Sequence, residues 1–99
     1  MARYEVFSGP VEGSYLLDVQ TDLIEHFTTR VVVPLLPVGT APPPVRRLHP
    51  IFEVGGQKLV MATHLMAAVP AADLKESRSN LARHHDDIVA ALDMLFQGF

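Results

Sequence analysis

The sequence of 99 residues contains no cysteine. This absence excludes a disulfide scaffold, a thiolate metal site and a cysteine nucleophile. It fits a reducing compartment, although it is also compatible with secretion. The first ten residues, MARYEVFSGP, lack the apolar segment of a signal peptide. We therefore expect a cytoplasmic protein.

Basic clusters and long apolar runs are also scarce. The formal net charge is −3, and the only local basic cluster is Arg46-Arg47, whereas nucleic-acid-binding domains usually carry a basic stripe. The longest uncharged apolar run, at 31–38, is interrupted by prolines and is far shorter than the ~20 residues of a membrane helix. We expect no nucleic-acid binding by the chain alone and no membrane span.

The composition nevertheless supports a folded domain. Hydrophobic residues make up 48% of the chain and charged residues only 19%. A chain of this length forms one domain, here 1–99, and buries roughly 65% of the surface that it exposes when unfolded. The low charge favours a compact fold that hides further surface in an oligomer.

Short strands dominate the first two thirds of the sequence. Alternating or β-branched patterns predict strands at 3–7, 15–20 and 30–36, and on both sides of a tight Gly55-Gly56 turn within 51–63. At 3–7 the alternation indicates one wet face, and Pro34 predicts an edge or a bulge. Residues 21–27 are ambiguous, with Thr21 able to cap a short turn. The proline-rich segment 37–50 is an extended connection rather than a PxxP ligand, 64–70 is a short apolar piece, and 71–80 is a polar loop with at most one helical turn.

The last part of the chain has helical periodicity. Apolar or weakly polar residues recur every three or four positions, at Leu81, His85, Ile88, Leu92, Leu95 and Phe99. This spacing predicts an amphipathic helix. Asn80 or Ser79 can cap its start, and Gly98 stands where a left-handed residue ends a helix. Phe99 lies beyond that stop, so it docks on the body, enters a dimer interface or meets a partner.

Two groups of polar residues could carry chemistry. The run His84–Asp87 contains metal-capable side chains, but neighbours on a helix diverge by about 100°, so they do not converge on one ion. A ribonuclease would need Thr28, Thr29 and Arg30 beside Thr63 and His64, and nothing in the sequence brings them together. We therefore expect no catalytic residues, no metal and no cofactor.

The ordered segments of the chain resemble a known family. LLDVQTDLIE, RVVVPL, HPIFEVGG, VMATHLMAAVP and DIVAALDMLFQGF are similar, in order and spacing, to CcdB-type toxins of bacterial toxin–antitoxin modules. The resemblance implies a mainly β SH3-like barrel, with an antiparallel sheet, a small accessory sheet and a long C-terminal helix. It also implies a homodimer that binds the DNA gyrase A subunit and traps the cleaved DNA complex without an active site of its own. A cognate CcdA-like antitoxin neutralises such toxins through a disordered segment, and the pair can repress its own operon.

The resemblance also implies a target-binding surface at the end of the helix, with an apolar loop pair near it. The corresponding residues here are Leu23, Ile24, Asp93, Phe96, Gln97, Gly98 and Phe99. Two of them depart from the family, since its gyrase poisons carry Trp where Gln97 stands and usually Asn where Asp93 stands. One alternative is therefore a protein of the same fold that binds an antitoxin but has lost or changed the gyrase target. A MazF-like endoribonuclease is a further alternative, because MazF-type toxins share the barrel.

Overall fold

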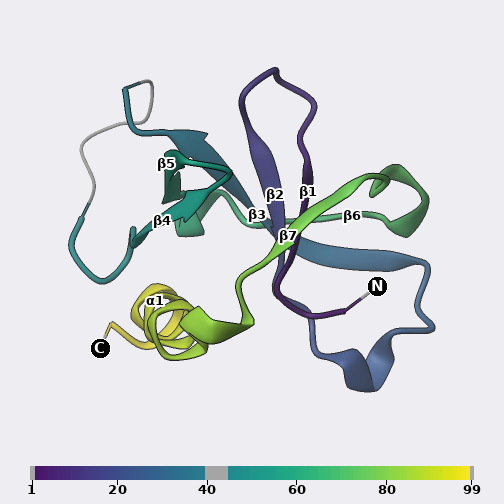
Figure 1. Ribbon diagram of the computed structural model, residues 1–99. Helices are drawn as coiled ribbons and strands as arrows, with labels where there is room; N and C mark the ends of the chain where they lie inside the picture. Colours follow the sequence, from purple (N-terminus) through teal and green to yellow (C-terminus); the bar gives the residue numbers. More distant parts are fainter. Residues whose placement is uncertain (1, 40–44, 99) are drawn as a thin grey trace.

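The structure of the protein, a computed structural model, describes residues 2–39 and 45–98 (Figure 1). Met1, the segment 40–44, which includes the whole PPP block, and Phe99 lie outside the described residues. The elements follow in the order β1 (Glu5–Ser8), β2 (Tyr15–Asp18), η1 (Asp22–Ile24), β3 (Thr29–Pro37), β4 (Ile51–Val54), β5 (Gln57–Met61), η2 (Thr63–Leu65), β6 (Ala67–Pro70), η3 (Ala71–Asp73), β7 (Ser77–Asn80), η4 (Ala82–His84) and α1 (His85–Gln97), where η marks a short 3-10 helix.

The strands form one curled antiparallel sheet. Within the described residues, its order is β4-β5-β3-β2-β1-β7, and β6 also pairs with β3. The long strand β3 makes this possible, because it lies along β2 on one side and along β6 and then β5 on the other. The small accessory sheet implied by the resemblance is thus continuous with the main sheet at β3. The mainly β, barrel-like fold with a C-terminal helix is confirmed.

Pro34 occupies the junction between the two partners of β3. On one side it lies opposite Leu16 of β2, and on the other side the pairing with β6 stops at Val32 and the pairing with β5 begins at Leu35. The Pro34 carbonyl accepts from Ala62 N, 2.9 Å away, so its nitrogen also points away from β2. The missing N–H therefore costs no bond of the β2–β3 ladder. β3 is therefore a central strand and not an edge. The irregularity expected at Pro34 is the break between the β6 and β5 pairings, whereas the pairing with β2 continues past it.

The sheet buries residues on both of its faces. One face packs against α1 through a core that includes Leu17, Val33 and Ile88. On the other face, Phe7 and Val32 pack against Leu74, which follows η3 in the connection from β6 to β7. The prediction of one wet face for the first strand is therefore wrong: neighbouring residues of β1 are buried on opposite sides, because the chain returns across the second face.

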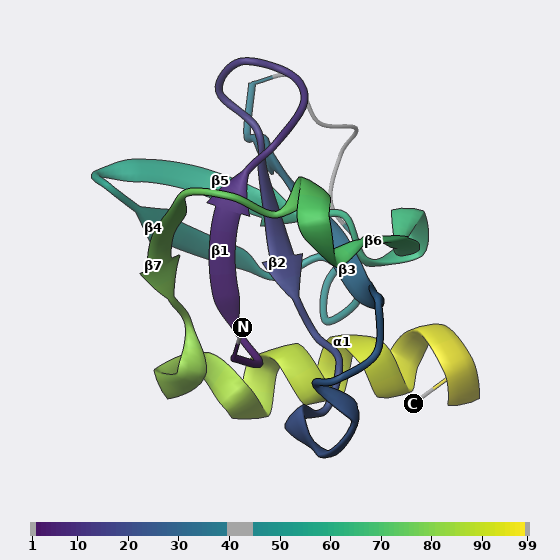
Figure 2. The same ribbon diagram turned by 90° about the vertical axis from the view of Figure 1, so that its right-hand side faces the viewer.

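The C-terminal helix lies across one end of the sheet (Figure 2). Its start differs slightly from the prediction, because residues 82–84 form the 3-10 turn η4 and α1 begins at His85. Asn80 Oδ1 accepts from Ala82 N at 2.7 Å, so Asn80 bonds the 3-10 turn η4. The N-cap residue of α1 itself is His84, whose side chain makes no capping bond. Ile88 and Ala91 are fully buried, which confirms the amphipathic pattern.

The main error of the sequence interpretation in this region is β7. The segment SRSN was predicted to be loop, yet it pairs with β1 from Asn80 opposite Glu5 to Ser77 opposite Phe7. Backbone hydrogen bonds to an edge strand do not need an apolar pattern, and three of these four side chains are exposed. The Gly55-Gly56 turn is confirmed, with φ values of 59° and 80° that suit a tight hairpin.

Candidate functional site

The end of α1 projects an aromatic side chain from the body. Phe96 is 70% exposed, and Gln97 and Gly98 beside it are also exposed. Gly98 has a φ of 80°, and its N–H donates to the Met94 carbonyl at 3.1 Å, which closes the helix as predicted. The end of α1 together with Gly98, residues 93–98, is called the helix tip below; its last three residues are exposed. Phe99 belongs to the predicted site but lies outside the described residues.

Contact between α1 and the sheet weakens toward the helix tip. Ile88 and Ala91 are fully buried, Leu92 is half-buried against the same core, and Leu95 is half-buried. Leu95 was predicted to belong to the core stripe, and it occupies the border of that stripe. The body of the protein therefore holds the first part of the helix and leaves Phe96 uncovered.

The polar residues of the helix tip contact each other. Gln97 Nε2 donates to Asp93 Oδ1 at 3.4 Å, one helical turn away. The last turn of α1 has no basic residue, so nothing on the helix itself offsets the negative end of the helix dipole. The helix tip thus combines one exposed ring with negative electrostatic potential.

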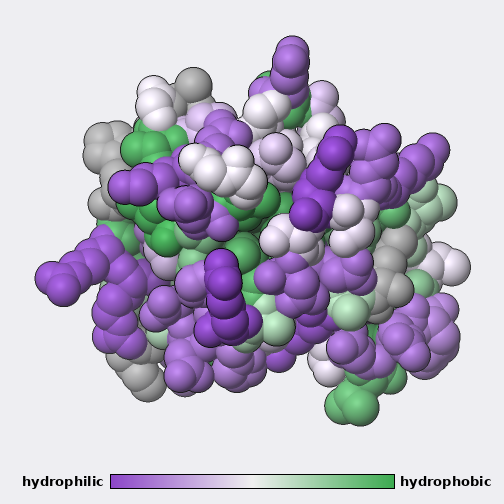
Figure 3. Space-filling model, in the orientation of Figure 1, coloured by the Kyte–Doolittle hydropathy of each residue, from purple (hydrophilic) through white to green (hydrophobic). Residues whose placement is uncertain are grey.

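The turn η1 forms a second exposed apolar point. Leu23 is 87% exposed, and Ile24 is half-buried. Thr21 caps the turn as predicted, since its Oγ1 accepts from Leu23 N at 3.3 Å. Figure 3 shows hydrophobic atoms protruding at the corner that η1 occupies in Figure 1.

The structure does not bring η1 and the helix tip together within one chain. Figure 1 places η1 at one lower corner of the molecule and α1 at the other. The expectation that the Leu23-Ile24 loop lies near the end of the helix is therefore wrong for a single protomer. The reason is topological: η1 connects β2 to β3, whereas α1 crosses the sheet from the edge strand β7.

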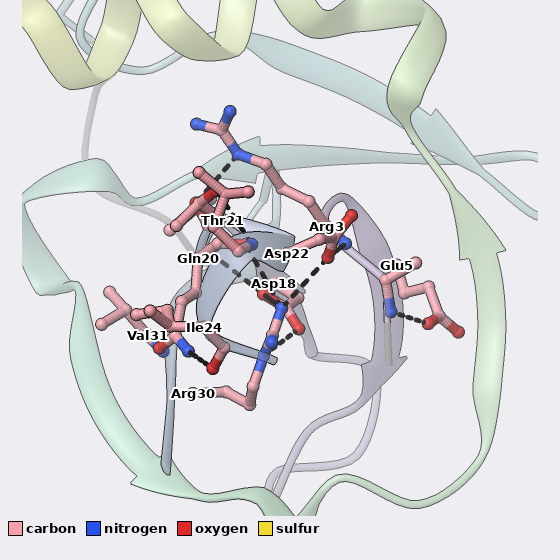
Figure 4. A network of polar contacts seen from close by, with 12 residues as sticks. Arg3, Glu5, Asp18, Gln20, Thr21, Asp22, Ile24, Arg30 and Val31 are labelled. Carbon is pink, nitrogen blue, oxygen red and sulfur yellow. Dashed lines mark hydrogen bonds and ion pairs between the residues drawn. The ribbon is translucent and has the colours of Figure 1, made fainter. Parts of the chain in front are cut away.

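A buried ion pair lies beneath η1 (Figure 4). Arg30 Nε donates to Asp18 Oδ2 at 2.7 Å, and Nη2 donates to Asp18 Oδ1 at 2.9 Å; both side chains are fully buried. Asp18 lies opposite Val32 in the β2–β3 ladder, so Arg30 is its diagonal neighbour on the same face. The hydrogen bonds to Asp18 raise the pKa of the Arg30 guanidinium.

Sequence reasoning gave little weight to Asp18. Asp18 and Asp22 are four residues apart, a spacing that has little meaning in a strand-to-loop region, yet both carboxylates face Arg30, with Asp22 Oδ1 3.7 Å from Nη2. The sequence did contain a signal for this pair: two predicted strands, 15–20 and 30–36, each carry a charged residue, Asp18 and Arg30, that is buried in the structure. Such residues need a partner when they are buried.

The residues that a ribonuclease would require are not assembled. The Arg30 side chain is sealed against Asp18, and Thr63 is buried, with Oγ1 donating to the Leu48 carbonyl at 2.5 Å. Exposed His64 instead contacts His49, with Nδ1 and Nε2 2.9 Å apart.

The run at the start of α1 also forms no ligand set. His85 Nδ1 lies 2.5 Å from the Tyr4 hydroxyl, whereas the His84 ring lies against Phe52, 4.9 Å between centroids. In the part of the chain that the structure describes, no three histidine or carboxylate side chains converge on a metal position. Among the same residues, no helix combines the length and the apolar content of a membrane crossing.

A shallow cavity of about 430 Å³ lies on the sheet face away from α1. Pro10, Leu16 and Val69 line its apolar part, and Asp73 and Lys75 stand among its lining residues. It contains no histidine or pair of carboxylates that would suit acid–base chemistry. The arrangement as a whole is suited to binding a macromolecule at exposed apolar points.

Comparison with solved structures shows which known proteins share this fold. The fold is similar to that of the Mycobacterium tuberculosis toxin MazF-mt6, with a TM-score of 0.73 and 15% identity over 93% of this chain and 95% of the toxin. It is also similar to an endoribonuclease solved in complex with its cognate antitoxin from a mycobacterial species, with a TM-score of 0.74 and 14% identity over 97% and 94% of the two chains. At such identities the likeness establishes the SH3-like barrel fold alone.

The sequence itself gives the narrower assignment. The family model described as CcdB protein matches residues 3–98. The chain belongs to the CcdB family, and the resemblance drawn from its ordered segments is confirmed.

Proposed function

We propose that this chain is the toxin of a type II toxin–antitoxin module, and that it binds the DNA gyrase A subunit and traps the cleaved DNA complex. The observation that carries the proposal is the projecting helix tip, with Phe96 70% exposed on a chain that matches the CcdB family over 3–98. An exposed aromatic ring on a rigid helix end suits insertion into a partner pocket.

The proposed toxin is a cytoplasmic homodimer with a single toxin domain, 1–99, and no active site. A dimer is consistent with the separation of η1 and the helix tip in one protomer (Figure 1), because a second copy can bring the two exposed points of different chains onto one target. The oligomeric state in solution, measured by light scattering, tests this part: a monomer at the concentrations that bind gyrase contradicts it.

A cognate CcdA-like antitoxin is the second proposed partner. The solved neighbour with its cognate antitoxin supports it, since that toxin has the same fold. Neutralisation is tested by co-expression with the product of a short adjacent gene. Growth restored only by that product supports the pairing, and continued toxicity with a soluble, co-expressed product contradicts it.

Induction in a gyrase-dependent bacterium tests the target. Wild type, Phe96→Ala and the exposed control Lys58→Ala are expressed at matched levels, and cleaved gyrase complexes are measured in the cells. We expect wild type and Lys58→Ala to arrest growth and accumulate cleaved DNA, and Phe96→Ala to do so weakly. Harmless expression of the wild type, without gyrase binding by the purified protein, overturns the proposal.

A second candidate function is antitoxin binding without gyrase poisoning. The contact between Gln97 and Asp93 favours it, because both side chains are polar where the family's poisons carry Trp and usually Asn. Antitoxin binding with no gyrase binding would distinguish this candidate from the first.

An endoribonuclease is the third candidate. The fold likeness to MazF-mt6 supports it, and the occupied guanidinium of Arg30 counts against it. Cleavage of RNA by the purified chain, abolished by Arg30→Ala in a folded variant, would favour it. RNA that stays intact after long incubation removes it.

A further inference from the structure

The turn η1 is held in place although its apolar side chain faces solvent. Gln20 Nε2 donates to the Ile24 carbonyl at 3.4 Å, which ties the end of the turn to the segment that follows β2. At the start of the turn, Asp22 Oδ1 accepts from Arg3 N at 2.8 Å. Leu23, 87% exposed, thus sits on a backbone that is tied at both ends.

The buried ion pair connects these ties (Figure 4). Besides its two bonds to Asp18, Arg30 Nη2 donates to the Gln20 carbonyl at 3.2 Å. Asp18 Oδ1 also accepts from Gln20 N at 3.0 Å, and Gln20 Oε1 accepts from Val31 N at 3.0 Å. The ion pair therefore holds the backbone of Gln20, and β3 holds its side-chain amide. The same amide bonds the Ile24 carbonyl, so Ile24 is held as well.

A role in overall stability does not account well for this arrangement. Apolar side chains of similar volume often stabilise a buried site at least as well as an ion pair does. In addition, Arg30 Nη1 is buried with no hydrogen-bond partner among the described residues, which adds an unfavourable contribution. A bidentate arginine–carboxylate pair does provide one defined direction, because both groups are planar.

We infer that Asp18, Gln20 and Arg30 are positioning residues that order η1 in advance, so that Leu23 meets the target without a further loss of conformational entropy. The inference rests on the proposed function, in which η1 contacts the target protein. Pre-ordering of an exposed loop strengthens binding by lowering the entropy lost on association.

The chemistry of η1 indicates the kind of surface that it fits. Asp22 precedes the exposed Leu23, Glu25 lies between Leu23 and the exposed Phe27, and the segment 21–29 contains no lysine or arginine. Such a surface repels a phosphate backbone and matches an apolar pocket of a protein edged by basic residues. The target protein, rather than its DNA, is therefore the occupant.

The test separates positioning from stability with the double variant Asp18→Leu/Arg30→Met. Amide hydrogen exchange of 21–27 is followed by mass spectrometry beside thermal unfolding. We expect exchange in 21–27 to rise about tenfold while the melting temperature stays near that of the wild type. Unchanged exchange in a folded double variant overturns the inference. Should the double variant not fold, Gln20→Met, which removes only the amide contacts, is judged by the same criterion.

Binding to the purified gyrase A subunit provides the second readout. We expect the double variant to lose about tenfold in affinity, as Leu23→Ala does, while Lys58→Ala binds like wild type. Faster exchange with unchanged affinity overturns the positioning role in binding. If the wild type does not bind gyrase, the proposed function is contradicted. The hydrogen-exchange result then tests by itself whether Asp18, Gln20 and Arg30 order η1.

Discussion

Gln97 donates a hydrogen bond from Nε2 to Oδ1 of Asp93, 3.4 Å away and one turn earlier on α1. The contact lies at the helix tip, which also carries the exposed Phe96. The hydrogen bond uses the side-chain amide of Gln97, the residue whose identity most affects the proposed binding to gyrase. Two polar side chains that satisfy each other offer a partner less apolar area than an indole ring would.

Restoring Trp at this position should strengthen binding to gyrase. A buried interface Trp contributes roughly 2–4 kcal/mol, so Gln97→Trp is expected to tighten the complex about 30- to 1000-fold. Calorimetric titration of the gyrase A subunit measures the change, and Gln97→Leu controls for a gain in general hydrophobicity. Equal affinities for Gln97→Trp and wild type would show that position 97 does not limit binding.

Phe96 should matter for binding and not for folding. Because its side chain is 70% exposed, Phe96→Ala is expected to change the free energy of unfolding by no more than about 0.5 kcal/mol. The matched core variant Ile88→Ala, at a fully buried position of the same helix, should lose about 2–5 kcal/mol. Urea unfolding measures both, and a large loss for Phe96→Ala would mean that the ring packs on the body.

The Arg30 and Asp18 pair gives a test of coupling. Arg30→Met alone leaves Asp18 fully buried without its partner and should cost about 3–5 kcal/mol. Adding Asp18→Leu removes the unpaired charge and should recover most of that loss. The double-mutant cycle, measured by urea unfolding, would contradict this account if the two effects simply added.

Stability should decline at mildly acidic pH through His49. Val45 N donates to Nδ1 of His49 at 2.8 Å, so the proton of the neutral ring lies on Nε2, facing His64. Burial, and then the positive charge of His64, lowers the pKa of His49. Below pH ~6.5 the unfolded chain therefore binds more protons than the native protein does. The free energy of unfolding falls as the pH drops from about 6.5 toward the lowered pKa of native His49.

Urea unfolding at pH about 7.5 and about 5.5 checks the sign. His49→Asn keeps an acceptor near Val45 N and removes the titrating group, so its stability should change less between the two conditions. An equal decline in wild type and variant would assign the effect to other groups.

Much of the fold follows from local patterns in the sequence. The β-branched run of β3 and the periodicity of α1 predicted a strand and the helix, and Gly55-Gly56 predicted the hairpin turn. The central place of β3 in the sheet was not predicted, because Pro34 indicated an edge or a bulge. Those signals are local, because β-branched residues, helical spacing and positive φ act within a few residues. The polar edge strand β7 carried no such signal, since its place depends on backbone pairing with β1.

The candidate site was less predictable for a physical reason. Helical spacing and Gly98 identified the exposed helix end, but the location of η1 relative to it depends on the path of the chain around the sheet. The pairing of Arg30 with Asp18 joins residues of neighbouring strands. Arginine and aspartate are most often exposed, and only the register of β2 against β3 shows that these two are buried together.

Trapping of gyrase on cleaved DNA tests the central claim most directly. Purified wild-type protein is incubated with gyrase, supercoiled plasmid and ATP, and linear DNA is quantified after denaturation and protease treatment. The account predicts linear DNA that increases with wild-type protein and is strongly reduced with Phe96→Ala. No linear DNA with folded wild type, at concentrations that saturate the antitoxin, would contradict the assignment of gyrase as the target.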